Sequence, residues 1–417
     1  MGRYYGVLDC NNFFVSCERL FRPDLLKRPV AVLSSNDGCV VARSEEIKAM
    51  GISMGVPYFQ VKDICDKGRV TLFSSNFTLY RDISDRVMQA LKKEVGEIEK
   101  YSIDEAFFTI STEVTKEELF EIRKRIIQTT GIPVSIGLGE TKTIAKIASK
   151  MAKKGDGVFV FGPDNWQRAT MDISCGEVWG LGRQATTKLK QNNINTVKEF
   201  IELPLDRVRK LLGVMGERIQ FELRGVSVHQ PDEHKFRLKQ SITSTRSFAK
   251  VITNRLELES IISSHVALCA SRLRKARLLA GSMTIILRAS RFSDFAHRKG
   301  SEEVLLSYPS AETSVLTKEA IRAVRNLYES GVPYKKAGIV MGDIVPFDFV
   351  SQTLFSDKES LETDQSLDSL TDSINQKFDG NLIHLASDFN NNQYSKAKLR
   401  SQSYTTKWKD IPSVKAK

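Results

Sequence analysis

Long apolar segments are absent from this chain of 417 residues. A helix that crosses a bilayer needs roughly 20 consecutive apolar residues, so the sequence predicts no membrane-spanning segment and no membrane partner. The first residues reach an acidic side chain, Asp9, too early for the apolar core of a secretory signal. We therefore expect a cytoplasmic protein.

Cysteine is scarce and forms no recognisable pattern. The six cysteines make neither a Cys-x-x-Cys pair nor the spacing of a disulfide-rich domain, so reduced thiols are expected. The pair Gly137-x-Gly139 lacks the remaining residues of a dinucleotide-binding or P-loop fingerprint.

Positive charge is in excess and is unevenly placed. The net charge is +12 and the isoelectric point is about 9.3. Residues 235–345 hold nineteen lysines and arginines against nine acids, so this segment alone contributes +10. A polyanionic partner is predicted, and nucleic acid is favoured over an anionic membrane because no basic helix has a Trp/Phe/Leu face. Since the segment has no run of exposed aromatic residues, a duplex held by its phosphates fits better than a single strand.

Two adjacent carboxylates, Asp104 and Glu105, interrupt an apolar and aromatic stretch. In a half-buried hairpin such neighbours repel each other and lose hydration, so a compensating charge is needed. A divalent cation such as Mg²⁺, which prefers carboxylate oxygens, would supply that charge. A solvated acid pair at the tip of a hairpin is the alternative.

A third carboxylate, Asp9, follows the apolar run 5–8, which predicts a buried strand that ends in an acid. Asp9 could simply cap the helix that follows. Three carboxylates on two adjacent strands would instead hold two cations, which activate a hydroxyl group and stabilise a phosphoryl leaving group.

The order of predicted elements indicates an α+β protein of several domains. A strand, a helix, a hairpin, a helix and a strand in the first part predict a ferredoxin-like layout, which polymerase palms and nucleotide cyclases share. The same order recurs in the basic segment, with predicted strands and helices at 241–248, 256–279, 283–287, 304–308, 312–328 and 337–344. Between the two units, Gly180-Leu181-Gly182 predicts a tight turn before a helix that could hold a DNA phosphate, or a plain helical hairpin.

Several motifs recur in the order that one known family has. The chain resembles the Y-family DNA polymerases, and most closely their UmuC-type branch, over about residues 1–350. The resemblance rests on DCNNFF (9–14), SSNDGCVVAR (34–43), FSSNF (73–77), YSIDEAF (101–107), GLG (137–139) with Thr143, AKIA (145–148) and MAKK (151–154). It implies error-prone translesion synthesis by a right-hand polymerase with a ferredoxin-like palm. The implied domains are a palm at 1–25 and 75–165, small fingers at 26–74, a helical thumb with helix-hairpin-helix character at 166–232, an α/β little finger at 238–347 and a flexible tail at 348–417.

The resemblance also implies roles for the acids. Asp9 and Asp104 would bridge two Mg²⁺ ions, Glu105 would complete the site at the primer end, and the backbone carbonyl of Cys10 would be a further ligand. Phe14 stands at the steric-gate position, where an aromatic ring excludes a ribose hydroxyl.

Further contacts to the incoming dNTP are implied for Phe13 and, at the triphosphate, for Arg43, Lys48 and Lys153. Glu45 stands where branches other than UmuC carry a triphosphate-binding tyrosine.

Contacts to primer-template DNA are expected at Gly180 and Gly182 in the thumb and at Arg246 and Arg288 in the little finger. In the tail, Gln352, Leu354 and Phe355 resemble a peptide that binds a sliding clamp. A recombinase or a small UmuD-like subunit is a further expected partner.

Two other functions remain open at this level. A catalytically idle scaffold that binds DNA and clamp would share the basic segment and the tail peptide. A nucleotide cyclase would share the palm layout, although the thumb-like hairpin and the basic second unit argue against it.

Overall fold

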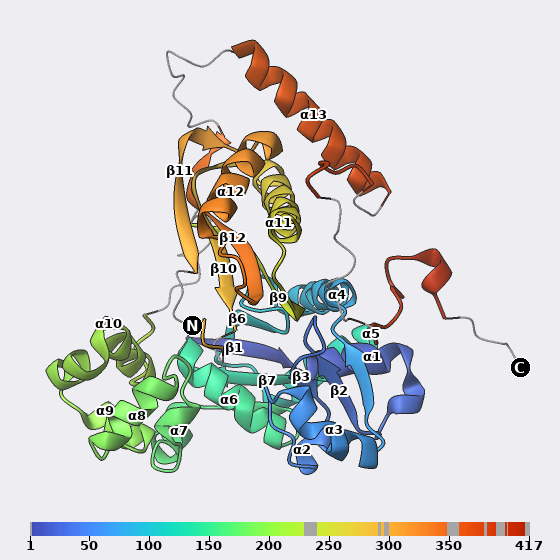
Figure 1. The fold of residues 1–417 in the computed structure, drawn as a ribbon. Coiled ribbons are helices and arrows are strands. Elements are labelled where there is room, and N and C mark those ends of the chain that lie inside the picture. Colours follow the sequence, from blue (N-terminus) through green and yellow to red (C-terminus); the bar gives the residue numbers. More distant parts are fainter. Residues whose placement is uncertain are drawn as a thin grey trace, which may run out of the picture. The chain divides into compact units, whose positions relative to one another are not determined.

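The computed structural model describes residues 2–228, 240–290, 293–295, 300–347, 358–378, 382–388, 397 and 399–412. The chain forms two compact units (Figure 1). The first comprises Met1–Lys235 together with Ala397–Lys417, and the second comprises Phe236–Lys396. The last part of the chain therefore belongs to the first unit.

The first unit is built on a five-stranded sheet in which β1 (Arg3–Cys10) is central and antiparallel to both of its neighbours. The strand order is β5-β6-β1-β7-β8, where the other strands are β5 (Ile98–Lys100), β6 (Glu105–Ser111), β7 (Val134–Gly139) and β8 (Val158–Val160). The predicted strand at 5–8 is thus real but longer at both ends.

Helices cover both faces of this sheet. One face packs its apolar side chains with α1 (Phe13–Phe21), α4 (Phe77–Val95) and α5 (Lys116–Thr130). The opposite face, represented by Val7 and Phe107, contacts α6 (Lys142–Lys154). A Thr115/Glu118 capping box begins α5, and Gly131, at φ 70°, ends it.

The glycines of Gly137-x-Gly139 allow α6 to lie directly against β7. A Cβ atom on Gly137 would come within 2.1 Å of the backbone nitrogen of Ser149, and one on Gly139 within 2.9 Å of that of Ala145. Close helix-on-strand packing therefore explains this pair.

A small subdomain follows α1 in the region expected to be fingers. Its three-stranded sheet has the order β3-β2-β4 and its own apolar core. The elements are η1 (Pro23–Leu25), β2 (Val30–Leu33), β3 (Val40–Arg43), α2 (Glu45–Ala49), α3 (Tyr58–Lys67) and β4 (Thr71–Ser74).

The region expected to be the thumb is helical. Its helices pack around the buried Trp166 and Phe200. They are α7 (Pro163–Ala169), η2 (Cys175–Glu177), α8 (Arg183–Gln191), α9 (Val197–Glu202) and α10 (Leu205–Leu223).

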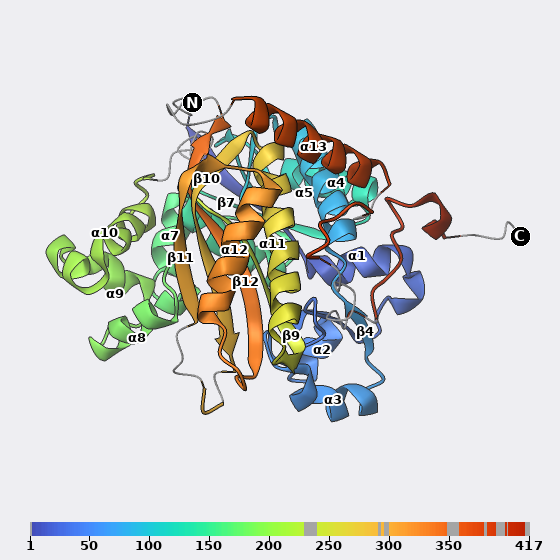
Figure 2. The ribbon, with the colours of Figure 1, turned by 45° about the horizontal axis from the view of Figure 1, so that its top comes forward.

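The second unit is a four-stranded sheet with two helices on one face, as Figure 2 shows. The strand order β11-β10-β12-β9 confirms the predicted β-α-β-β-α-β layout. The helix expected at 256–279 ends earlier, because Arg277 turns the chain at φ 53°. The elements are β9 (Ile242–Ile252), α11 (Arg255–Lys275), β10 (Leu278–Ala289), β11 (Ser301–Ser310), α12 (Thr313–Leu327) and β12 (Tyr334–Pro346).

The stretch 348–417, expected to be a flexible tail, differs from that expectation where the structure describes it. It contains α13 (Lys358–Lys377), whose Asp368 and Asp372 form ion pairs of 3.1 and 2.8 Å with Arg274 of α11. Residues 399–412 end in η4 (Trp408–Asp410) and contact the first unit. These segments are ordered because each has a partner. Asp368 and Asp372 form ion pairs with Arg274, and Leu399 accepts a hydrogen bond from Ser74 at the free edge of β4. Gln352, Leu354 and Phe355 lie outside the described residues.

Among the residues placed by the structure, no helix is both long and apolar enough to cross a bilayer.

Candidate active site

The ends of β1 and β6 bring the three predicted carboxylates to one place. Asp9 pairs with Glu105 across the antiparallel ladder, and the backbone N–H of Cys10 donates to the carbonyl of Asp104 at 2.9 Å. Asp9 and Glu105 extend the face of the sheet that carries Val7 and Phe107, which is the face that α6 covers. Glu105 therefore begins β6 and Asp104 directly precedes it, and because both are half-buried the pair is not a solvated hairpin tip.

Ser102 orients the acid pair. Its hydroxyl donates to Oδ1 of Asp104 at 2.6 Å, and its Oγ accepts from the backbone nitrogens of Asp104 at 3.2 Å and Glu105 at 3.0 Å. These bonds fix the turn that leads into β6, so the direction of the Asp104 carboxylate is set before any ligand arrives.

Two lysines on α6 supply positive charge to the carboxylates. Nζ of Lys153 lies 2.6 Å from Oδ2 of Asp9, and Nζ of Lys146 lies 3.1 Å from Oε2 of Glu105. Burial raises the pKa of Asp9 to about 7, with the neighbouring Glu105 adding to the effect and Lys153 opposing it. A nearby cation such as Lys153 therefore favours the charged form of Asp9 near neutral pH.

Lys146 was not predicted from the sequence. Its ammonium group lies 4.4 Å from the ring centre of Tyr101 and 5.2 Å from that of Trp179, whose Nε1 donates to the Tyr101 hydroxyl at 3.0 Å. A signal was present, because Lys146 and Lys153 are seven residues apart and so share one face of a helix that covers the acid-bearing strands.

The donor set suits a hard divalent cation, since three carboxylates lie close together at the end of one sheet. In their present positions, no three Asp, Glu, His or Cys side chains among the described residues are grouped as a metal site. Lys153 and Lys146 engage Asp9 and Glu105 instead, and Ser102 engages Asp104. A bound cation would have to take over part of these contacts.

An aromatic cluster lies at the start of α1, which follows the strand that carries Asp9. Phe13 is buried, whereas Phe14 is half-buried. The ring of Phe14 stacks on Tyr80 with centroids 4.5 Å apart and an angle of 14°, and it meets Phe77 edge-on at 5.6 Å. The ring expected to contact the sugar is thus supported from α4.

The cationic residues expected at a triphosphate differ in their surroundings. Lys153 lies against Asp9. Lys48 pairs with Glu45 at 2.6 Å, and Glu45 also accepts from Asn12 of the loop before α1 at 2.9 Å. The guanidinium group of Arg43 donates to the carbonyl of Ile52, so this side chain is held within the small subdomain and is not paired with the carboxylates.

Comparisons with known proteins identify the family of this chain. Residues 8–150 match the profile of the impB/mucB/samB family, residues 239–354 match its C-terminal domain, and residues 365–414 match a domain of unknown function (DUF4113). The protein ImpB of Salmonella typhimurium is 33% identical over 98% of this chain and 99% of its own length. The protein UmuC of Salmonella typhimurium strain LT2 is 33% identical over 99% of this chain and 100% of its own. The chain belongs to the UmuC-like branch of the Y-family DNA polymerases.

A solved structure of a Y-family DNA polymerase chimera supports the fold. It is 18% identical, has a TM-score of 0.69, and the match covers 82% of this chain and 99% of the chimera. The right-hand α+β architecture expected from the resemblance is therefore confirmed.

Gly180 and Gly182, which are expected to contact DNA in this Y-family polymerase, have different roles in the turn before α8. Gly180 has φ 90°, and a Cβ atom there would come within 2.8 Å of Ile219. Gly182 is the N-cap of α8, and a Cβ atom there would meet open space. The turn therefore leaves backbone N–H groups accessible at the start of a helix.

The two little-finger arginines lie on opposite faces of their sheet. Arg246 pairs with Ala337, a buried residue of the face that packs on α11 and α12. Arg288 is exposed and pairs with Lys336 on the other face. Only Arg288 is therefore placed on a sheet face free of these helices, and the expectation that both arginines contact DNA is not supported for Arg246.

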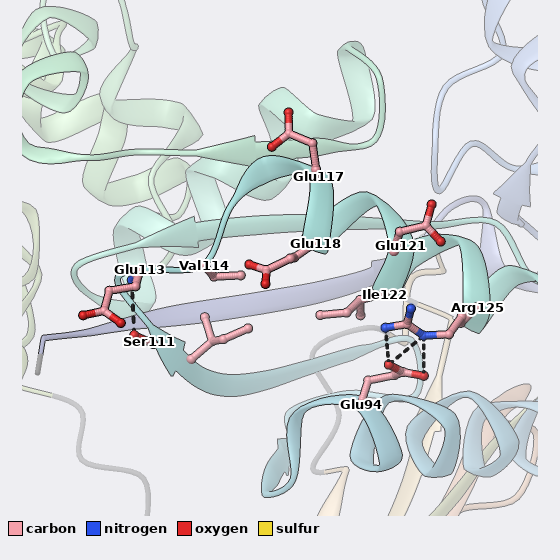
Figure 3. Close-up of a pocket in the computed structure, with 10 residues that line it drawn as sticks. Glu94, Ser111, Glu113, Val114, Glu117, Glu118, Glu121, Ile122 and Arg125 are labelled. Carbon is pink, nitrogen blue, oxygen red and sulfur yellow. Dashed lines mark hydrogen bonds and ion pairs between the residues drawn. The ribbon is translucent and has the colours of Figure 1, made fainter.

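A hollow of about 800 Å³ lies in the first unit, and Asp9, Asp104 and Glu105 are not among its lining residues. Figure 3 shows that glutamates of α4, α5 and the segment between β6 and α5 line it, together with Arg125, which pairs with Glu94 at 2.7 Å. Because its lining is mostly acidic, this hollow would repel a nucleotide or a DNA backbone.

Proposed function

We propose that Asp9, Asp104 and Glu105 are the catalytic carboxylates with which this polymerase extends a primer on damaged DNA. The protein is a DNA-directed DNA polymerase that performs translesion synthesis, as its family does. Three acids on paired strand ends are what a nucleotidyl transfer site requires. That pairing is the observation that carries the proposal.

Divalent metal is part of this chemistry, and we assign two Mg²⁺ ions to the site. When bound, they lower the pKa of the primer 3′-hydroxyl and neutralise the departing pyrophosphate. Asp9 and Asp104 would hold both ions, with Glu105 and the Cys10 carbonyl as further ligands. Ser102 keeps the Asp104 carboxylate aimed at the site through its 2.6 Å bond.

The two lysines of α6 have different roles: Lys146 contacts a carboxylate of the site, and Lys153 is the lysine that would contact the substrate. Lys146 stays with Glu105 and the two aromatic rings, and so holds that carboxylate in place. Lys153, which is partly exposed, is free to exchange Asp9 for the triphosphate of an incoming dNTP. Lys48 is a second triphosphate contact once it leaves Glu45.

Selection for deoxynucleotides rests on Phe14 in this proposal. Its ring is supported by Tyr80 and is half-buried beside the acids, so it can fill the space that a ribose 2′-hydroxyl would need. Phe13 is buried beneath it and holds the start of α1 in place.

Primer-template DNA would be held through its backbone. The turn at Gly180 and Gly182 offers N–H groups to a phosphate, and the sheet face with Arg288 and Lys336 offers cations. A grip without base readout tolerates damaged templates.

Two protein partners are part of the proposal. A sliding clamp would take the peptide that includes Gln352, Leu354 and Phe355. Similarity to proteins named UmuC supports a UmuD-like subunit, and a recombinase is a further candidate.

Primer extension on undamaged and abasic templates tests the proposal, with Mg²⁺ and all four dNTPs. We expect the natural chain to extend both primers and Asp104→Ala to lose about 100-fold or more in rate. Glu113→Ala, an exposed acid beyond the end of β6, is the matched control and should extend normally. Equal extension by the natural chain and Asp104→Ala would refute the site. DNA binding without extension by the natural chain would instead favour the idle scaffold.

A further inference from the structure

The segment 399–404, named here the C-terminal strap, forms the outer edge of the β3-β2-β4 sheet. The backbone nitrogen of Ser74 donates to the carbonyl of Leu399 at 3.0 Å, and the Leu399 nitrogen donates to Oγ of Ser74 at 3.0 Å. A parallel bridge then pairs Ser74 with Arg400. Because β4 is the edge strand, this single bridge adds the strap to the free edge of that sheet at Ser74. It lies within the region that matches the domain of unknown function.

A buried asparagine ties the strap to the first turn of α4. Nδ2 of Asn76 donates to the carbonyl of Ser401 at 3.2 Å, to its Oγ at 3.0 Å and to the carbonyl of Gln402 at 3.2 Å. Its Oδ1 caps α4 by accepting from Leu79 N–H at 3.4 Å and also accepts from Arg400 at 3.1 Å. Asn76 is fully buried, so the start of α4 and the strap are fixed together.

The strap also reaches a buried carboxyl group on α1. The Ser401 hydroxyl donates to Oε1 of Glu18 at 3.0 Å, and the Tyr80 hydroxyl donates to the same oxygen at 2.6 Å. Glu18 is fully buried, and its Oε2 has no hydrogen-bond partner among the described residues. Burial raises the pKa of Glu18, and these two donors oppose that shift. Ser401 therefore supplies one of two bonds on which this buried group depends.

The ring of Tyr80 also contacts Phe14, the residue that we assign to sugar selection. Tyr80 is fully buried and stacks on Phe14 at 4.5 Å, so the bond to Glu18 sets the surface against which Phe14 lies. A second stack, between Tyr404 and Phe21 at 4.6 Å, holds the strap to the other end of α1. A continuous series of contacts thus runs from Ser401 through Glu18 and Tyr80 to Phe14, all within one compact unit.

We propose that the C-terminal strap sets the position of Phe14, and that Ser401 and Tyr80 are positioning residues for discrimination between deoxyribose and ribose. The inference rests on the proposed role of Phe14 as the ring that excludes a ribose hydroxyl. Without the Ser401 hydroxyl, Glu18 keeps only its bond from Tyr80 and is itself held less firmly, so Tyr80 and the stacked Phe14 can move away from the sugar. Ribonucleotides should then be accepted more readily.

Single-nucleotide insertion by the full chain tests this, with kcat/KM measured for a dNTP and the matching rNTP. We expect Ser401→Ala to lower the dNTP-to-rNTP ratio roughly fivefold, the equivalent of one lost hydrogen bond, through a gain in ribonucleotide insertion. Ser401→Thr retains the hydroxyl and should keep the natural ratio. Ser403→Ala is the matched control, because the bonds of Ser403 to Asp410 and Thr406 run through its backbone.

Tyr80→Phe provides a second route if Ser401→Ala does not fold, since it removes the other donor to Glu18 and should lower the ratio in the same direction. Phe14→Ala separates the two proposals. If Phe14→Ala lowers the ratio while Ser401→Ala and Tyr80→Phe match the natural chain, the strap has no such role and the assignment of Phe14 stands. If Phe14→Ala leaves the ratio unchanged, the assignment of Phe14 is wrong and the strap inference fails with it. Equal losses in Ser401→Ala and Ser403→Ala would also overturn the inference, because the effect would not depend on the bond to Glu18.

Discussion

Acidification should destabilise the second unit through one histidine. His265 of α11 forms a hydrogen bond of 2.7 Å between its Nδ1 and Oγ of Ser244. Burial, together with the positive charges of Arg246 and Arg272, lowers its pKa from 6.5 to about 4. The folded chain therefore keeps this imidazole neutral over a pH range in which the unfolded chain would protonate it.

The direction and size of the effect follow from linkage. Between pH 6.5 and 4 the unfolded state binds one more proton than the folded state at this position, so the free energy of unfolding falls as pH falls. The stabilisation is fully present above pH 6.5 and is lost by pH 4. Over that interval the loss amounts to about 3 kcal/mol, at 1.36 kcal/mol for each pH unit.

Urea unfolding at pH 7 and pH 4.5 measures this loss in the natural chain and in His265→Gln. Other groups also titrate over this range, so the difference between the two chains is the informative quantity. His265→Gln should lose about 2 kcal/mol less than the natural chain on acidification. His384→Gln, at an exposed position, is the control and should behave like the natural chain. Identical losses in the natural chain and His265→Gln would refute the reasoning.

Three further outcomes are expected. Arg288→Ala should weaken duplex binding and reduce its salt dependence in a filter-binding titration, whereas Arg246→Ala should change neither. A loss of binding in Arg246→Ala but not in Arg288→Ala would contradict the assignment of the two arginines to opposite faces of the sheet. Gly137→Ala should lower the free energy of unfolding by about 3 kcal/mol in thermal denaturation, because its Cβ atom would overlap the backbone of α6; an unchanged melting temperature would show that α6 can move away. Arg274→Ala should increase amide hydrogen exchange in α13, since Asp368 and Asp372 lose their partner, and unaltered protection would mean that α13 is held by other contacts.

The fold and the three acids could be predicted because each depends on a local pattern. The apolar run before Asp9 predicts a strand that ends in an acid, and the hairpin around Asp104 and Glu105 is equally local. That these strands are neighbours follows from the ferredoxin-like order of elements. The length of strands and helices was less accurate, since an element's ends depend on tertiary contacts.

The face of a strand residue was harder to predict. Arg246 is one residue away from the exposed Ser247, and a shift of one position moves a side chain to the other face of the sheet. The basic composition of the segment includes both arginines but does not show which face of the sheet each one occupies. Only the pairing of Arg246 with Ala337 assigns its side.

The strap was missed for a different reason. Its residues are polar and were interpreted as part of a flexible tail. The bond between Asn76 and Ser401 joins positions that are 325 residues apart, and nothing in either local sequence indicates the other. Glu18 and Tyr80 were likewise unremarkable, because a buried acid can be identified only once its surroundings are known.

Because the strap is synthesised long after the residues that it contacts, the nucleotide pocket is completed late in protein synthesis. At ribosomal rates of about 5 to 20 residues per second, Ser401 is made roughly 16 to 65 s after Asn76. During that interval the nascent chain already contains all three carboxylates, Phe14 and Tyr80, while the edge of β4 and one donor to Glu18 are missing. An incomplete chain that stops before the strap would thus carry the whole catalytic centre with a less well supported aromatic ring. Synthesis of the strap is the step that supplies these last contacts.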